Sequence, residues 1–394
     1  MEDLMSLHAT LSTSAGSPTV DTVNEASDVV AIAQGLAPKL AARTAEFDEN
    51  DRFVAENYVL LKEAGLVEAG VPRELGGKGA GIPELANMLR MLAQACGSTA
   101  LAFSMHTHQV AIPVWRWRHQ KIAAIEPLLR RVAAERLILL SSGGSDWIGG
   151  SGRATKVDGG YRISARKGFT SGAEAGDLLM TGAVVEGTNT VIHFAAPMKA
   201  PEVRVEQTWK VLGMRGTGSN DVVIDNLFIP EAGVAFSRSA GEWHPVFQII
   251  ATIAFPLIYA VYLGVAERAR DLAVDLAKRK APTPHSLDLA GRMETSLRAA
   301  RLAHRWMLET VDLNAPSADT VNEVMIGRSL VADHAIRTVE LALELGGGMG
   351  FYRRNGLERC FRDIQAARFH PLQTGPQAQY AGAMALGHPV ATIF

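Results

Sequence analysis

The chain has 394 residues, 47% of them hydrophobic and 20% charged, which is enough for two or three domains with sizeable cores. Its formal net charge is −2 and it contains no long basic run, which argues against nucleic acid as a partner. The two cysteines, Cys96 and Cys360, are far apart and lack metal-ligand spacing, so we expect neither a disulfide framework nor a metal site.

The sequence shows no pattern typical of secretion or of membrane insertion. The N-terminus lacks the charged start and apolar core of a signal peptide, and we expect no apolar run to approach a membrane span of roughly 20 residues. These observations predict a cytoplasmic protein without membrane contact. Residues 1–25 are rich in Ser, Thr and Ala without a clear period, which predicts a poorly ordered tail.

Helical periodicity begins directly after this tail. Apolar residues recur at helical spacing in Val30–Leu40, Val54–Leu66, Ile82–Cys96 and Thr99–Trp115. The last of these segments is strongly apolar, as expected of a buried helix. The pattern predicts an all-α domain over residues 26–136.

Shorter, β-like segments follow. They are Gly152–Val157, Tyr161–Ala165, Asp177–Val184 and Thr190–Ala195, with a hairpin signal at Gly159-Gly160. Further along, a glycine-rich turn at residues 213–219 precedes an alternating strand that ends at Pro230. We predict a β-domain over residues 137–240.

The remainder of the chain is helical again. Three long segments have helical character, Phe247–Lys280, Leu287–Val311 and Val321–Leu345. Long helices joined by short loops are typical of an antiparallel bundle. We therefore predict a C-terminal helical domain over residues 241–394.

Two motifs resemble signatures of the acyl-CoA dehydrogenase superfamily. The stretch WKVLGMRGTGSNDVVIDNLFIP, residues 209–230, resembles the family's β-domain signature in a form common in the branch that includes flavin monooxygenases. The segments ELGGGMGF, from residue 344, and ERCFRD, from residue 358, resemble the family's "QxxGGxGY…ERxxRD". In the second motif, Arg362 and Asp363 suggest a structural ion pair. The resemblance covers about residues 28–385.

This resemblance implies an architecture. The expected fold is α+β, mainly α, with an N-terminal α-helical domain, a central β-domain and a C-terminal four-helix bundle. A flavin, FAD or FMN, is expected between the β-domain and the bundle. The family also implies a homotetramer.

The resemblance also implies cofactor contacts near the flavin ring. Residues 144–146, GSD, match a loop that lies against flavin in the family, which makes Ser145 a candidate for a phosphate contact. The segment RKGFTSG resembles "GTKxWITNG" and places Phe169 and Ser171 beside the isoalloxazine. An apolar wall and a hydroxyl group suit a flat ring with a polar rim.

A second group of contacts is implied across a subunit boundary. Arg279 matches an arginine that reaches the flavin pyrophosphate of a neighbouring subunit, although the sequence that should follow it is replaced by APTP. Gly346 and Gly347 match a segment that lies against the adenosine-diphosphate part of a partner's flavin. Glu344 stands where glutamine is usual, and its carboxylate would repel pyrophosphate if it pointed the same way.

The catalytic glutamate of the family's dehydrogenases is missing. Counted without gaps, its usual position falls on Pro371, beside His370, and no Asp or Glu follows Asp363. An alternative position used by some members falls near Ala254, within the acid-free stretch 247–266. Neither proline nor alanine can take the α-proton of a thioester substrate.

Histidines are the alternative catalytic candidates. The superfamily's monooxygenases lack the glutamate, and many carry a histidine at about the place of His370, where an imidazole with a pKa near neutrality assists proton transfer. His106 and His108 lie in the buried helix SMHTH. Either one of them is a core histidine while the other faces outward, or His106 reaches the flavin pocket; His106 is thus a second catalytic candidate.

The sequence therefore predicts a flavin-dependent oxidoreductase acting on a small molecule. Within that class we favour a monooxygenase that uses oxygen and reduced flavin from a separate reductase. The first alternative is an acyl-CoA dehydrogenase with an unidentified base. The second is a non-catalytic flavin-binding protein, which would expose both His106 and His370 on its surface.

Overall fold

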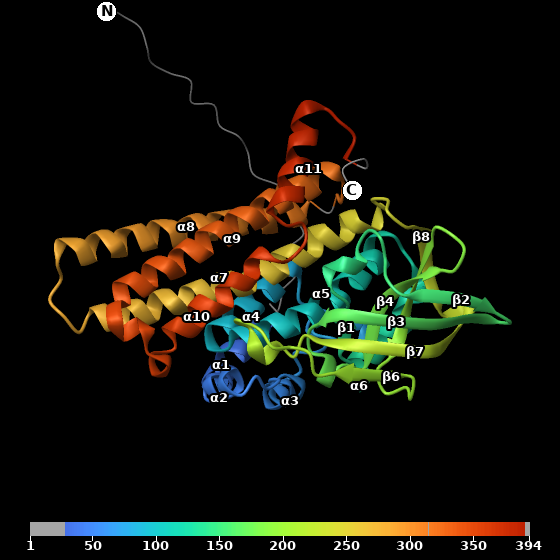
Figure 1. The fold of residues 1–394 in the computed structure, drawn as a ribbon, viewed down its shortest axis with the longest axis horizontal. Coiled ribbons are helices and arrows are strands. Elements are labelled where there is room, and N and C mark those ends of the chain that lie inside the picture. Colours follow the sequence, from blue (N-terminus) through green and yellow to red (C-terminus); the bar gives the residue numbers. More distant parts are fainter. Residues whose placement is uncertain (1–27, 314, 391–394) are drawn as a thin grey trace, which may run out of the picture.

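The computed structural model describes residues 28–313 and 315–390 (Figure 1). The predicted tail over residues 1–25 lies outside these ranges. The chain begins with α1 (Val29–Ala41), α2 (Thr44–Glu49), α3 (Ala55–Glu63), α4 (Ile82–Ala95), α5 (Gly97–His119) and α6 (Glu126–Glu135). The segments with helical periodicity therefore form helices, and α5 is buried along most of its length.

An eight-stranded mixed sheet follows in the middle of the chain. Its strands are β1 (Leu139–Ser141), β2 (Arg153–Val157), β3 (Gly160–Thr170), β4 (Leu178–Val185), β5 (Thr190–Pro197), β6 (Val203–Glu206), β7 (Asn220–Pro230) and β8 (Val234–Ser239). The spatial order is β6-β7-β3-β2-β4-β5-β8, with β1 paired to β4. The β2–β3 pair is the hairpin that Gly159-Gly160 predicts, because Val157 pairs with Gly160 across the turn.

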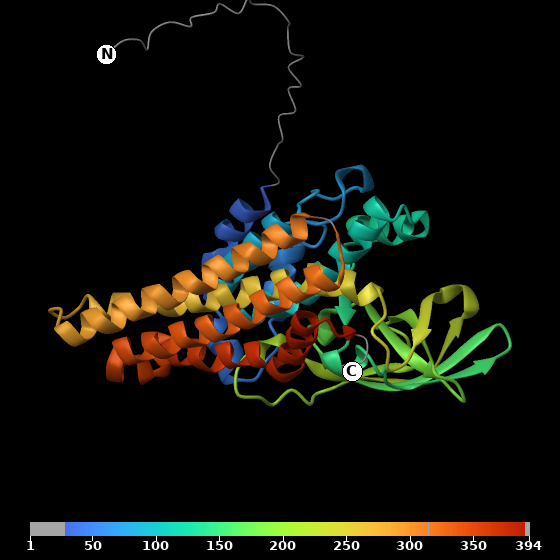
Figure 2. The same cartoon turned by 90° about the horizontal axis from the view of Figure 1, so that it is seen from above.

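The C-terminal part contains the longest helices. They are α7 (Val246–Ala277), α8 (Pro284–Asp312) and α9 (Ala318–Gly346), followed by the shorter α10 (Leu357–Ile364) and α11 (Thr374–Leu386). Figures 1 and 2 show α7, α8 and α9 side by side, with the sheet at the other end of the molecule. α10 lies against α7 and α9, and α11 packs on α9. The order of helices, sheet and helices agrees with the predicted α+β architecture.

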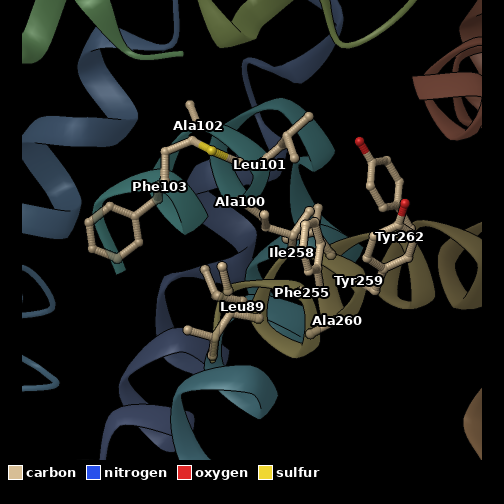
Figure 3. Close-up of a cluster of buried hydrophobic side chains, with 14 of the residues drawn as sticks. Leu89, Ala100, Leu101, Ala102, Phe103, Phe255, Ile258, Tyr259, Ala260 and Tyr262 are labelled. Carbon is tan, nitrogen blue, oxygen red and sulfur yellow. The ribbon is translucent and has the colours of Figure 1, made fainter. Parts of the chain in front are cut away.

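α7 corrects an expectation about apolar runs. Residues 246–266 carry no charged side chain, so this helix is long and apolar enough to cross a membrane. However, 94% of its most apolar 18-residue window is buried inside the protein. Figure 3 shows part of that environment, in which α7 side chains such as Phe255 and Ile258 meet Leu89 of α4 and Ala100 of α5. An apolar helix that other helices surround is a core helix.

This packing joins the first and last helical parts of the chain. α4 and α5 both contact α7, so their apolar side chains share one core with the bundle. The division into separate domains at residues 136 and 240 therefore stays a prediction.

The two sequence motifs of the family-like signature meet in space. A Cβ atom at Gly213 would lie 2.3 Å from the backbone carbonyl of Arg362, so only glycine permits this approach. The next backbone amide, that of Met214, donates a hydrogen bond to the Asp363 carboxylate. Arg362 pairs with Asp48 and Glu358. The predicted ion pair between Arg362 and Asp363 is therefore wrong: Arg362 pairs with two other carboxylates, and Asp363 accepts a backbone hydrogen bond.

Candidate functional site

His370 lies in the turn between α10 and α11, against α7 and α9. Its Nε2 atom is 2.6 Å from the hydroxyl oxygen of Tyr262 on α7. Its carbonyl oxygen accepts a hydrogen bond of 2.9 Å from the guanidinium of Arg328 on α9. The ring of Tyr259 stands edge-on to the imidazole. Three long-range contacts thus fix the position of a histidine that sits in a connecting segment.

The surroundings of His370 keep its imidazole neutral. Burial lowers the pKa of His370 to about 3, and the nearby Arg328 and His108 act in the same direction. A cation beside the ring and a low-polarity environment both disfavour the imidazolium form. At neutral pH, His370 is therefore available as a hydrogen-bonding group and not as a charged acid.

His106, the second catalytic candidate, is held by the backbone of other segments. The Leu139 backbone amide donates to its Nδ1 atom at 3.0 Å, and its Nε2 atom therefore donates to the Val67 carbonyl at 2.9 Å. The side chain is 1% exposed. Both ring nitrogens are used to connect α5 with β1 and with the loop after α3. This geometry argues against a catalytic role and supports the alternative of a core histidine.

His108, two residues further along α5, has a different environment. Its Nδ1 atom lies 3.0 Å from the Ser104 carbonyl and must donate to it, because a carbonyl oxygen can only accept. The Nε2 atom therefore carries a lone pair, and it has no hydrogen-bond partner in the described part of the chain. Burial lowers the pKa of His108 to about 4. We therefore replace His106 by His108 as the second candidate.

The glycine-serine loop packs directly beside His370. A Cβ atom at Gly144 would lie 2.3 Å from a ring carbon of Pro371, and one at Gly143 would lie 2.8 Å from the Cβ of Phe169. The amide of Gly143 also donates to the Gly168 carbonyl at 3.0 Å. The structure thus brings the GSD loop, the Phe169 segment and the His370 turn together. Ser145 lies in the backbone turn Gly144–Asp146, and its phosphate contact stays a prediction.

A buried lysine determines the shape of this loop. The Lys167 ammonium donates to Asp146 at 3.0 Å, to the Ser151 carbonyl at 2.9 Å and to the Gly182 carbonyl at 2.7 Å. On the other side, Arg238 donates to the carbonyls of residues 146–148. Lys167 and Arg238 thus bind the loop from two sides and hold it in one conformation.

Phe169 presents an exposed aromatic face at the edge of the site. Its ring is 65% exposed, and its backbone has φ of 53°, a left-handed conformation that is unusual for a bulky residue. The indole of Trp209 stands edge-on to it at 5.8 Å between ring centroids. Backbone outliers of this kind concentrate at ligand sites. Phe169 and Trp209 form an aromatic surface suited to a flat ligand.

Ser171 ends a chain of buried hydroxyl groups. Thr217 donates to the Met214 carbonyl at 2.9 Å, and its oxygen lies 2.7 Å from that of Ser219, which lies 2.8 Å from that of Ser171. Because the Thr217 hydrogen is used, Ser219 must donate to Thr217, and Ser171 must donate to Ser219. Ser171 is left with accepting capacity only, so it can bind an N–H group of a ligand.

Arg279, Gly346 and Gly347 lie elsewhere. Arg279 follows the C-terminal end of α7, and the connection from α7 to α8 is at the end of the bundle away from the sheet (Figure 1). A Cβ atom at Gly346 would touch Leu276, which places the glycines at that same end. Gly347 is exposed, with φ of 55° and open space around it. These residues therefore cannot share a ligand with His370 in one chain.

The buried carboxylates on α7 and α10 have structural partners. Glu267 accepts hydrogen bonds from Arg90 and Arg301; burial acts to raise its pKa, but these bonds lower it on balance. Asp363 accepts from the Met214 amide, and burial raises its pKa to about 6. Within the described residues, no group of three His, Cys, Asp or Glu side chains could hold a metal ion.

The residues near His370 fit a flavin ring. They offer an aromatic surface at Phe169 and Trp209, a hydroxyl that can only accept, and a glycine loop that approaches closely. A flavin needs an apolar wall and acceptors for its ring N–H groups. The fit concerns the flavin ring alone, because the group around Arg279 lies at the other end of the bundle.

Sequence reasoning missed several of these residues. Tyr262 and Tyr259 are three residues apart in the apolar run of α7, and Arg328 is a lone cation among apolar residues of α9. The spacing of these residues indicates which face of its helix each one occupies. It does not indicate that they contact His370. For Lys167, the only sequence signal is its place beside Phe169 in the "GTKxWITNG"-like segment.

Comparison with known proteins agrees with this geometry. Residues 30–130 match the acyl-CoA dehydrogenase N-terminal domain family, and residues 257–374 match the acyl-CoA dehydrogenase C-terminal domain family. The putative acyl-CoA dehydrogenase YdbM of Bacillus subtilis is 27% identical over 351 residues, which cover 85% of this chain and 91% of that protein. Dibenzothiophene monooxygenase of Rhodococcus erythropolis is 28% identical over 382 residues, covering 87% and 89%.

A solved structure is similar over nearly the whole chain. KijD3, crystallised with FMN and dTDP-3-amino-2,3,6-trideoxy-4-keto-3-methyl-D-glucose, superimposes with a TM-score of 0.86 at 26% identity. The match covers 92% of this chain and 94% of KijD3. Both family domains, the relatives and the fold agree. The chain belongs to the acyl-CoA dehydrogenase superfamily and is a flavin-dependent oxidoreductase.

Proposed function

We propose that the protein is a monooxygenase that uses oxygen and reduced flavin. The observation that carries this proposal is the replacement of the dehydrogenase glutamate by the His370-Pro371 turn. The other place for that glutamate, near Ala254, lies in the uncharged part of α7. Neutral imidazoles suit a reaction in which protons move without a strong carboxylate base.

The described residues divide the work of the site. Phe169, supported edge-on by Trp209, would hold the flat face of the flavin, and Ser171 would accept a hydrogen bond from an N–H group of the ring. When bound in its reduced form, the flavin supplies the electrons that activate oxygen. The bare Nε2 atom of His108 takes a proton from the substrate or its bound water. His370 orients the reacting oxygen by a hydrogen bond.

Known relatives support the reaction class and suggest the flavin. The name of dibenzothiophene monooxygenase indicates a sulfur heterocycle as its substrate, and KijD3 was crystallised with FMN and an amino-sugar nucleotide. We infer a small substrate with an oxidisable sulfur, amine or aromatic group. We also favour FMN, because KijD3, whose match covers 92% of this chain, was crystallised with this flavin.

We further propose a cytoplasmic homotetramer that receives reduced flavin from a separate reductase. The outer faces of α8 and α9 expose Leu302, Trp306 and Leu330, each at least 45% accessible. Exposed apolar side chains gathered on neighbouring helices favour self-association. Light scattering during size-exclusion chromatography tests the assembly, and Trp306→Glu should reduce its mass if this face is the interface.

The test of function compares two reactions of the purified protein. Reduced FMN bound to the protein is mixed with oxygen, and flavin oxidation is followed together with hydrogen peroxide release. We expect binding of reduced FMN and slower peroxide release than from free FMN, because the site retains the activated oxygen. In the second reaction, acyl-CoA thioesters are added anaerobically to the oxidised protein. Bleaching of the flavin by a thioester would refute the monooxygenase proposal.

A second candidate function is acyl-CoA dehydrogenation with Asp363 as the base. It is favoured by the raised pKa of this buried carboxyl and by the relative YdbM, a putative acyl-CoA dehydrogenase. If a thioester bleaches the flavin, Asp363→Asn distinguishes the base, because the variant keeps the side-chain shape but cannot accept the proton. A protein that binds flavin and shows neither reaction is the non-catalytic alternative.

A further inference from the structure

We propose that Tyr262 and Arg328 are positioning residues that fix His370 as a neutral imidazole with its hydrogen on Nδ1. In this arrangement the Nδ1–H group is the part of His370 that faces the reacting molecules. The consequence for catalysis rests on the proposed function, whereas the position of the hydrogen is a property of the protein alone.

The hydroxyl of Tyr262 decides which nitrogen carries the hydrogen. Two arrangements fit the 2.6 Å contact: the phenol donates to Nε2, or Nε2–H donates to the phenol. In the second arrangement the phenol hydrogen has no acceptor in the described part of the chain, although Tyr262 is fully buried. A buried unpaired donor costs about 1–3 kcal/mol. The phenol therefore donates, and the hydrogen of the neutral imidazole is on Nδ1.

Burial of Tyr262 supports the same direction. It raises the pKa of Tyr262 well above its ordinary value, so the phenol keeps its hydrogen at neutral pH. His370 is half-buried as a residue, whereas Tyr262 is 0% exposed, and Tyr262 occupies the Nε2 side of the imidazole. The nitrogen that is not bound by Tyr262 is thus the one that a ligand can reach.

Arg328 fixes the backbone to which the ring is attached. One guanidinium nitrogen donates to the carbonyls of both Ala367 and His370, at 3.2 and 2.9 Å. The hydroxyl of Tyr259 donates to the same Ala367 carbonyl at 2.8 Å. Arg328 is 1% exposed, and no carboxylate of the described residues forms an ion pair with it. Its charge is therefore directed at this turn and opposes protonation of the imidazole.

Every element around His370 contributes a defined group. α7 provides the phenols of Tyr259 and Tyr262, α9 the guanidinium of Arg328, and α5 the imidazole of His108. Asp363 of α10 faces Tyr262 more distantly and raises the pKa of its phenol. His108 has a bare Nε2 atom, and His370 presents an N–H group, so the two rings are opposite in character. One can accept a proton while the other donates a hydrogen bond.

The direct test uses nitrogen-15 NMR of the flavin-free protein labelled at histidine. Long-range couplings from the ring carbons distinguish protonated from bare nitrogens, and His370→Gln identifies the signals among the eleven histidines. We expect the Nδ1–H form in the wild type at pH 7. We expect Tyr262→Phe to give the Nε2–H form or a mixture, because the donor that fixed Nε2 is lost.

Tyr259→Phe is the matched control. It removes the phenol hydroxyl of the residue one helical turn before Tyr262. That hydroxyl contacts the Ala367 carbonyl and not the His370 imidazole. The Nδ1–H form should persist in this variant. An Nε2–H form in the wild type would overturn the proposal, as would an unchanged Nδ1–H form in Tyr262→Phe.

Activity provides a second readout, which a merely structural role would not change. The oxidation of reduced flavin should be independent of pH between pH 6 and 8 in the wild type. Tyr262→Phe should lower the rate roughly 2- to 12-fold, the effect of one hydrogen bond. Arg328→Lys, which keeps the charge on a shorter side chain with a less rigid donor group, should lower the rate less and keep the Nδ1–H form. If NMR shows this form but no oxygen reaction occurs, the proposed function fails while the positioning role stands.

Discussion

Replacing Lys167 by Met should destabilise the protein and release the glycine-serine loop. The Lys167 side chain is 0% exposed and its ammonium binds one carboxylate and two carbonyls. Loss of one partner of a buried ion pair costs about 3–5 kcal/mol. Because the Asp146 side chain keeps 12% exposure and can recruit water, we expect the lower end, about 3 kcal/mol. At roughly 2–4 °C per kcal/mol, the melting temperature should fall by at least 6 °C.

The double variant tests whether the buried charge is the cause. In Lys167→Met, Asp146 is left as an unpaired carboxylate, and changing it to Asn removes that charge. Lys167→Met with Asp146→Asn should therefore be more stable than Lys167→Met alone. Lys156→Met is the control in the same sheet, because Lys156 forms only a solvent-exposed pair with Glu231, which water screens.

The assay is thermal unfolding followed by circular dichroism, with flavin affinity measured on each folded variant. Lys167→Met should bind flavin more weakly, because Asp146 and Ser151 no longer hold the loop beside Phe169 and Pro371. A melting temperature within about 2 °C of the wild type would refute the reasoning. Strict additivity of the two substitutions would refute it as well.

Three further predictions concern the site and its histidines. His108→Gln should reduce turnover about 100-fold or more with little change in melting temperature. His106→Gln should mainly lower the melting temperature. Measuring turnover and melting temperature on both variants separates the two roles. Gly144→Ala should lower flavin affinity and turnover because its Cβ would displace Pro371, whereas Gly149→Ala, with open space around it, should leave both unchanged. Finally, stability against urea should fall as pH decreases from about 6.5 to 4. Burial lowers the pKa of five histidines, so in this pH range they bind protons only after unfolding. They are His106, His108, His193, His304 and His370. The raised pKa of Asp363 acts in the opposite direction, with stability lost as pH rises from about 4 to 6, so Asp363→Asn should make the acid loss steeper.

The fold was predictable where local periodicity is strong. The spacing of apolar residues predicted the helices that became α4, α5, α7, α8 and α9 within a few residues of their observed ends. The edge strands β6 and β8 were not predicted, because short edge strands with exposed polar residues lack a clear alternation. Whether α7 spans a membrane was not predictable from its composition either. Only the surrounding helices, and not the composition of α7, identify it as a core helix.

The site was predictable only in part. His370, Phe169 and the glycine-serine loop were recognised from motifs, and they do lie together. The choice between His106 and His108 was not predictable, because it depends on two backbone groups, Val67 and Leu139, that are more than 30 residues away from His106. Hydrogen bonds to distant backbone decide which nitrogen stays free, and helical periodicity carries no information about them.

The contact between Gly213 and α10 joins the two family motifs in space. Gly213 allows the 213–219 turn to reach the Arg362 backbone, and the Met214 amide binds Asp363 at the end of α10. The same turn supplies Ser219, which orients Ser171, and α10 leads directly into the His370 segment. One contact thus sets the position of the Ser171 hydroxyl relative to the segment that follows the "RD" motif. The position of the family's glutamate, Pro371, lies outside this contact, so its loss leaves the Gly213–α10 contact intact.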